Sequence, residues 1–180
     1  MSPITLIEKY TAGNEKLRQV LLTHSQSVAD KALAIVAAHP EWNIDQQFIY
    51  EAAMLHDIGC VRVNAPAIHC LGNEPYIRHG LMGGEILRSE GLEAHARVAE
   101  RHTGTGLTAE EIQRQNLPLP LLDFTPERIE EEIICYADKF YSKTHLDKEK
   151  TYEQALRSLA KFGEKGLQVF AEWHEKFENH

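Results

Sequence analysis

The chain has 180 residues, of which 43% are hydrophobic and 26% charged, an ordinary balance for a folded globular protein. A chain of this length is expected to form one domain, here residues 1–180, that buries roughly 70% of its unfolded surface. The formal net charge of −8 disfavours a broad phosphate-binding surface, so we expect no nucleic acid polymer as a partner.

The N-terminal sequence and the cysteines bear on the cellular compartment of the protein. The N-terminus lacks a basic segment followed by an apolar run, and no stretch approaches the ~20 apolar residues of a membrane span. The three cysteines, Cys60, Cys70 and Cys135, have no spacing typical of zinc sites and indicate reduced, buried thiols. We therefore expect a cytoplasmic protein that does not contact a membrane.

Helical patterns fill most of the chain, which predicts an all-α bundle. In order, the expected helices cover about residues 3–12, 15–38, 45–57, 76–91, 92–103, 107–112 and 125–142, with one or two more between 151 and 178. Ser2 and Asn14 are the expected N-caps of the first two helices, and Thr108 with Glu111 forms a capping box. Residues 61–74 and the proline-interrupted segment 117–124 are expected loops.

Four histidines and two aspartates lie on the inward faces of these helices or next to them. They are His24, His56, Asp57, His79, His102 and Asp138. His24, for example, continues the apolar stripe between Leu21 and Val28. A single inward histidine is more often a hydrogen-bonded core residue than a ligand, but six such groups favour a shared metal site. Imidazole and carboxylate ligands suit zinc, iron or manganese, and six suffice for two ions if one carboxylate bridges.

The order H…HD…H…H…D resembles the HD-domain metal-dependent phosphohydrolases. The strings "HDIG", "RHGLMGGEIL", "ERHTG" and "YADKF" carry this resemblance over about residues 24–141. The two additional histidines are similar to those of the dinuclear branch of that superfamily. The resemblance implies a single-domain HD-type helical bundle with its motif core at 24–141 and the C-terminal helices at 151–178 packing on it.

The resemblance also implies a ligand set and a reaction. Two divalent ions, iron or manganese, would be bound, the first by His24, His56, Asp57 and Asp138 and the second by His79 and His102 with Asp57 bridging. Asp57 is therefore the expected catalytic residue. A hydroxide bridging the ions would attack phosphorus and cleave a phosphate ester or anhydride. The expected substrate is a nucleotide or another small phosphorylated molecule.

Cationic side chains beside these ligands are candidate substrate contacts. They are Arg62, Arg78, Arg101 and Lys139. Many relatives carry a lysine directly after "HDIG", where this chain has Cys60, and Arg62 is a possible substitute. The glycines Gly80, Gly83 and Gly84 would let backbones approach closely, either at the site or in helix packing alone.

Two other functions stay open. Diiron oxygenases of the same fold cleave carbon–carbon or carbon–phosphorus bonds, and a regulatory module could bind a nucleotide without cleaving it. The oligomeric state is open as well, because the apolar stripe from Leu156 to Phe177 could pack on the core or form a homodimer.

Overall fold

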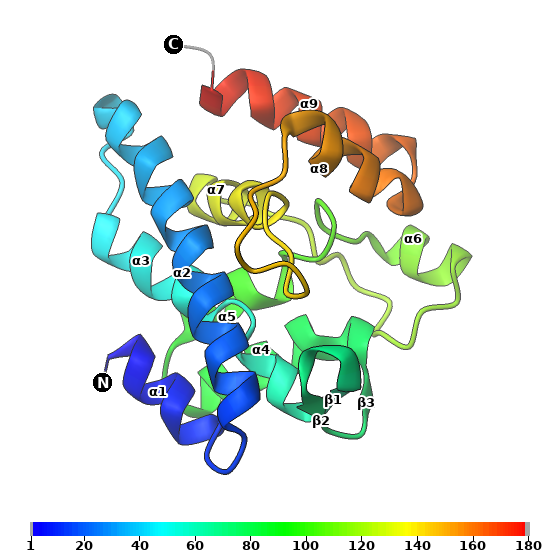
Figure 1. The fold of residues 1–180 in the computed structure, drawn as a ribbon. Helices are drawn as coiled ribbons and strands as arrows, with labels where there is room; N and C mark the ends of the chain where they lie inside the picture. Colours follow the sequence, from blue (N-terminus) through cyan, green and yellow to red (C-terminus); the bar gives the residue numbers. More distant parts are fainter. Residues whose placement is uncertain (1, 179–180) are drawn as a thin grey trace.

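The computed structural model describes residues 2–178, so residues 1, 179 and 180 of the expected domain lie outside the described part (Figure 1). Within this range the chain forms helices and one small sheet, which confirms the all-α class. The α-helices are α1 (Pro3–Tyr10), α2 (Glu15–Ala38), α3 (Gln46–Leu55), α4 (His79–Ser89), α5 (Glu93–Glu100), α6 (Ala109–Arg114), α7 (Ile129–Asp138), α8 (Tyr152–Leu159) and α9 (Glu164–Glu178). No helix in the described range is long and apolar enough to cross a membrane.

The predicted capping residues start their helices. Ser2 Oγ accepts a hydrogen bond from the Thr5 N–H at 3.2 Å, and Asn14 Oδ1 accepts one from Leu17 N–H at 3.1 Å. Thr108 and Glu111 form the expected capping box of α6. These side chains satisfy N–H groups that have no partner in the first helical turn.

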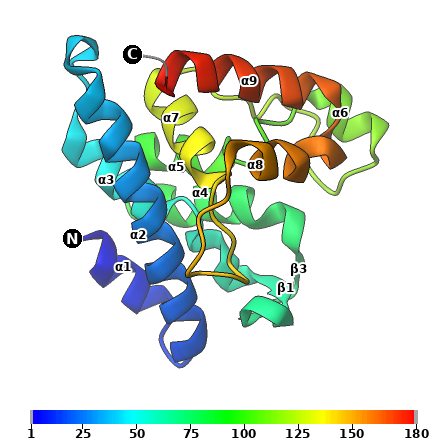
Figure 2. The same ribbon diagram turned by 45° about the horizontal axis from the view of Figure 1, so that its top comes forward.

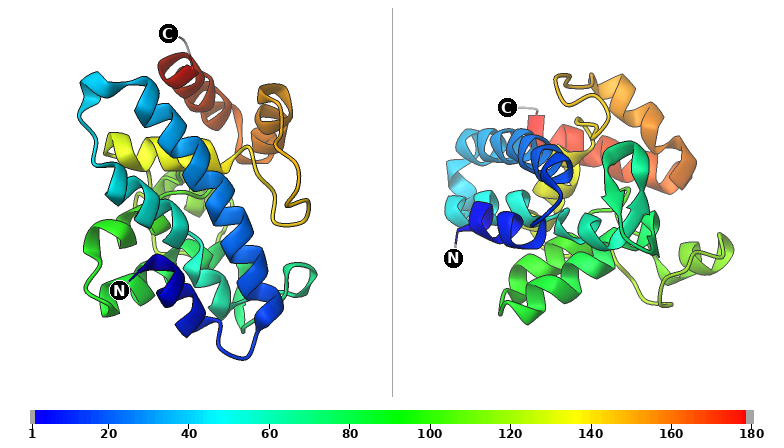
Figure 3. Two further views of the ribbon diagram at one scale, coloured as in Figure 1. Left: turned by 60° about the vertical axis from the view of Figure 1, so that its left-hand side comes forward. Right: turned by 60° about the horizontal axis from the view of Figure 1, so that its bottom comes forward.

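The long helix α2 is the central support of the fold. It packs along α3 and α7, while α4 packs against α5 (Figure 3). The inward side of α2 is fully or almost fully buried, and its apolar residues belong to the same hydrophobic core as Ile49 of α3 and Ile133 of α7. Because His24 lies within this buried stripe, helix periodicity alone points its ring into the core.

Helix α9 lies over α7 and packs against α8 (Figure 2). Phe170 and Phe177 of α9 contact the Tyr136 ring of α7, with ring centroids 5.1 Å and 5.3 Å apart. The long connection between α7 and α8, residues 139–151, runs down beside α2, where Lys31 pairs with Glu149 at 3.1 Å. The connection therefore lies close to α2, the helix that contains His24.

The segment expected as a loop at 61–74 contains short strands and 3-10 turns instead. The central strand β1 (Val63–Ala65) pairs antiparallel with β2 (Cys70–Leu71) and parallel with β3 (Glu74–Pro75). Strands this short carry no readable alternation of apolar and polar residues, so sequence periodicity cannot reveal them.

Several helix limits also differ from the expected ones. The helix expected from Thr125 begins at Ile129, because the Glu131 carboxylate accepts the backbone N–H groups of Glu127 and Arg128 and caps the chain there. Likewise, α3 ends at Leu55 and α5 at Glu100. The side chains of residues 57 and 102 therefore project from helix ends rather than from within helices.

Candidate metal centre

The six predicted ligands converge in the core. His24 lies within α2, His56 and Asp57 follow α3, His79 begins α4, His102 follows α5, and Asp138 ends α7. All six are buried, with no more than 9% of any residue exposed. The cluster joins residues as far apart in sequence as His24 and Asp138, whose Nε2 and Oδ1 atoms are 3.0 Å apart.

One half of the cluster joins two imidazoles and two carboxylates. Asp57 Oδ2 lies 3.2 Å from His24 Nε2 and 3.0 Å from His56 Nε2. Asp138 Oδ1 lies 3.0 Å and 3.3 Å from the same two nitrogens. These four donor atoms lie within 4.8 Å of one another. They form a compact set of two nitrogen and two oxygen donors.

The other half joins two imidazoles and the second oxygen of the same aspartate. Asp57 Oδ1 lies 3.3 Å from His102 Nε2 and 3.6 Å from His79 Nε2, and the two Nε2 atoms are 2.9 Å apart. Asp57 thus turns one carboxylate oxygen toward each group. This is the arrangement that a bridging carboxylate requires.

Three of the imidazoles are held in one orientation by the turn that precedes them. The Nδ1 atoms of His56, His79 and His102 lie 2.6 to 2.7 Å from the carbonyl oxygens of Ala53, Tyr76 and Ala99. A carbonyl only accepts, so each Nδ1 is assigned as the N–H donor. In the neutral rings each Nε2 then presents a lone pair to the cluster, as metal-binding histidines do.

The electrostatics of the cluster favour a cation at its centre. Burial alone would raise the pKa of Asp57, but the charges of His56 and Lys143 hold it well below its usual range. Burial opposes protonation of His56, yet the carboxylates of Asp57 and Asp138 raise its pKa to about 10. Burial and the neighbouring His102 lower the pKa of His79 to about 3, so its ring is neutral.

Two of the donor atoms lack the hydrogen bonds that buried polar atoms usually form, which is compatible with binding of a metal ion. His56 Nε2 and Asp57 Oδ2 are completely buried, and within residues 2–178 neither forms a hydrogen bond of acceptable geometry, although they lie 3.0 Å apart and Lys143 pairs with Asp57 Oδ2. Buried polar atoms that lack hydrogen bonds are costly unless an ion or water satisfies them. The buried histidines and aspartates are therefore compatible with divalent metal binding, through nitrogen and oxygen donors that suit first-row metals.

Glycines bring the ligand-bearing segments into backbone contact. A Cβ atom at Gly59, in the turn that carries Asp57, would lie 1.9 Å from the His79 carbonyl oxygen. A Cβ atom at Gly80 would lie 2.7 Å from the Ala99 carbonyl oxygen, three residues before His102. Only glycine fits at such distances, so the "HDIG" glycine sets the separation between Asp57 and His79.

The three arginines predicted as substrate contacts are held by other partners. The Arg62 guanidinium pairs with Glu85 at 2.9 Å, and Arg78 pairs with Glu74 at 2.6 Å. Arg101 donates to the backbone carbonyls of Asp123 and Thr125. None of the three lines the pocket that opens onto the cluster. A contact with substrate would require each arginine to leave its present partner.

The two lysines near the cluster have different positions. Lys139 Nζ donates to Asp138 Oδ2 at 2.5 Å and to the His102 carbonyl at 2.7 Å, so it orients two ligand-bearing residues. Lys143, which the sequence did not single out, places its Nζ 2.7 Å from Asp57 Oδ2 and 3.2 Å from the Tyr76 hydroxyl. Tyr76 in turn stacks on the His79 ring, with centroids 4.6 Å apart.

A pocket of about 190 Å³ leads from the surface to this cluster. His79, His102 and Asp138 form part of its lining, and Lys143 lies beside them. Lys161 and Phe162, which precede α9, also line this pocket. This pocket therefore gives a ligand from the surface access to three of the predicted metal ligands.

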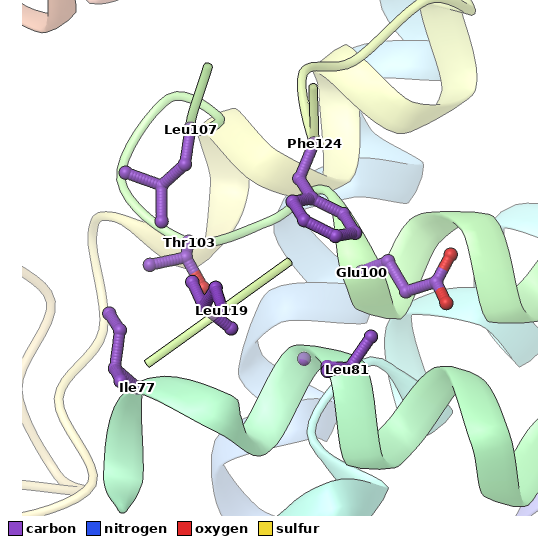
Figure 4. Close-up of a pocket in the computed structure, with 8 residues that line it drawn as sticks. Ile77, Leu81, Glu100, Thr103, Leu107, Leu119 and Phe124 are labelled. Atoms are coloured by element: carbon purple, nitrogen blue, oxygen red, sulfur yellow. The ribbon is translucent and has the colours of Figure 1, made fainter. Parts of the chain in front are cut away.

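A neighbouring pocket, drawn in Figure 4, adjoins the pocket at the cluster. Leu81 of α4 lies beside Leu119 and Phe124, which come from the segment after α6. Its volume of about 10 Å³ leaves room for about one water molecule. It shares Ile77 and Thr103 with the pocket at the cluster, so this apolar packing supports that pocket's wall.

Two relatives in sequence are longer than this chain, which matches only part of each. A tRNA (cytidine(56)-2'-O)-methyltransferase of Picrophilus torridus is 33% identical over 134 residues, which cover 74% of this chain and 35% of that protein. A protein of the same description from Thermoplasma volcanium is 32% identical over 170 residues, 94% of this chain and 42% of that protein. The chain therefore spans less than half the length of either relative.

The fold and the family model agree. The solved HD domain of the L. monocytogenes phosphodiesterase PgpH, in complex with cyclic-di-AMP, superposes with a TM-score of 0.55 and 16% identity over 98% of both chains. This likeness shows the HD-type fold. A model of the HD domain family matches residues 21–142, more than half of the chain. The chain therefore belongs to the HD domain family, within the superfamily of metal-dependent phosphohydrolases that the "HDIG" string indicates.

Proposed function

We propose that this protein hydrolyses a phosphate ester or anhydride of a small molecule, with two divalent ions, iron or manganese, as cofactors. The observation that carries the proposal is the position of Asp57, whose two oxygens face separate groups of donors. His24, His56, Asp57 and Asp138 would hold one ion, and Asp57, His79 and His102 the other. Such ions activate water and neutralise charge on the phosphoryl group.

The side chains around the ligands have separate tasks in this reaction. Lys143 directs its ammonium group at the ligand cluster from the pocket side, where it can bind phosphoryl oxygens. Tyr76 holds Lys143 through its hydroxyl and the His79 ring through stacking. Lys139 keeps Asp138 in place. A preorganised cation near developing negative charge lowers the barrier without reorganisation during the reaction.

Methyl transfer to tRNA is not proposed for this chain. The segments that match cover only 35% and 42% of the two relatives so described. The net charge of −8 also disfavours extended contacts with RNA phosphates. We propose a small phosphorylated molecule, for example a nucleotide, as substrate.

The proposal is tested by phosphate release from a panel of nucleotides and simple phosphate esters. Protein purified without chelator would be reconstituted with iron, manganese or magnesium before the assay. We expect turnover that depends on metal and that His56→Gln abolishes, while His145→Gln, an exposed histidine of the 139–151 connection, retains it. Tight nucleotide binding without turnover would support the regulatory alternative. Oxygen uptake with a diol or phosphonate, and no phosphate release, would support the oxygenase.

A further inference from the structure

The pocket at the candidate metal centre carries positive charge at two separate places. Lys143 lies at its inner end, where its side chain is 12% exposed and its Nζ contacts Asp57. Lys161 lies in the wall before α9 and is exposed to solvent. Lys143 belongs to the 139–151 connection and Lys161 to the turn before α9, so the fold brings them to the same pocket from separate segments.

Lys161 is available to a ligand. Within residues 2–178 its ammonium group forms no ion pair, and it lies 5.1 Å from the centroid of the adjacent Phe162 ring. Lys143, by contrast, already faces the carboxylate of Asp57. The outer lysine therefore offers a cation that no protein carboxylate in the described range neutralises.

The charge around this pocket is more positive than that of the whole chain. Burial lowers the pKa of Lys150, and the ammonium groups of Lys139, Lys161 and Lys143 lower it further, against the opposing effect of Asp138. Lys139, Lys143 and Lys161 thus all lie close enough to Lys150 for their charges to oppose its protonation, in a protein whose net charge is −8. A local cationic field of this kind attracts an anion that carries more than one charged group.

We propose that the substrate carries a second anionic group, phosphate or carboxylate, which Lys161 binds while the scissile phosphoryl group lies beside Lys143. Ile77 and Phe162 would contact the part of the molecule between the two charges. The pocket volume of about 190 Å³ is below the usual range for drug-sized ligands, which selects a compact dianionic molecule. This inference rests on the proposed phosphohydrolase function and names its substrate class.

Binding of stable probes tests the second anionic site without turnover. Propylphosphonate has one anionic group, whereas 3-phosphonopropanoate and 1,3-propanediphosphonate add a carboxylate or a second phosphonate. We expect at least one doubly anionic probe to bind metal-loaded protein roughly fivefold tighter than propylphosphonate, a gain typical of an exposed ion pair. The preferred probe shows which second group the site takes.

Matched variants assign the gain to Lys161. Lys161→Met should remove the preference for the doubly anionic probe and leave the affinity for propylphosphonate and the metal content unchanged. Lys165→Met, an exposed lysine of α9 outside this pocket, should keep the preference. Equal affinities for all probes, no binding of any, or an equal loss for all in Lys161→Met would overturn the inference. Absence of phosphate release from every ester would count against the proposed function alone.

Discussion

Replacing Gly59 by alanine tests whether backbone contact between the "HDIG" turn and α4 sets the geometry of the site. A Cβ atom at this position would lie 1.9 Å from the His79 carbonyl oxygen and 2.3 Å from the Gly83 nitrogen. Both are backbone atoms, so the turn and the helix must move apart by more than an ångström. Overpacking costs about 1–3 kcal/mol, and we expect the upper end here because no side chain can yield.

A cost of about 3 kcal/mol corresponds to a fall in Tm of roughly 6–12 °C for a chain of this size. The same movement carries His79 away from Asp57, so metal content should fall as well. Circular dichroism melting and metal analysis of the purified variant measure both effects. Gly166→Ala is the matched control, because its Cβ atom would lie 3.3 Å from the Thr105 hydroxyl, and its Tm should stay within a few degrees of wild type. A Gly59→Ala protein with wild-type Tm and metal content would refute the reasoning.

Three further predictions concern metal and substrate. Removal of metal with a chelator should lower Tm by roughly 5–11 °C. The reason is that a metal ion present at a hundred times its Kd stabilises the folded state by about 2.7 kcal/mol. An unchanged melting curve would argue against a resident ion. His102→Gln should reduce bound metal from two ions to one, whereas His95→Gln, which contacts Glu51 outside the cluster, should keep both; equal metal content in the two variants would contradict the assignment. Lys143→Met should retain metal and lose roughly a hundredfold in turnover, while Lys148→Met in the same connection should retain activity; full activity of Lys143→Met would remove it from the reaction.

Helix periodicity and capping residues predicted most of the fold. The position of His24 followed from the apolar stripe of α2, and the starts of α1, α2 and α6 followed from their N-caps. These features are local, so a sequence contains them directly. The strands at 63–75 and the late start of α7 depend on contacts made only after folding, and the sequence patterns did not reveal them.

The clustering of the six candidate donors could be predicted from the sequence, but the surroundings of the site could not. Motif order brought out the six donors, which the structure places together. Lys143 escaped notice because the 139–151 connection has no periodicity and no motif to mark it. The Lys143 ammonium group and the Cys60 thiol both contact the Asp57 carboxylate, so the two side chains lie close together. Cys60 occupies the position after "HDIG" where many relatives carry lysine. A cation supplied from a distant segment is visible only in three dimensions.

Metal content per chain, measured for wild type and Asp57→Ala after reconstitution, tests the central claim most directly. Asp57 presents one oxygen to each half of the cluster, so its removal should empty both positions. We predict two ions per chain in the wild type and fewer than about 0.2 in the variant, a loss expected when a ligand shared by two ions is removed. A wild type that binds one ion at most, or an Asp57→Ala protein that keeps two, would contradict the dinuclear centre.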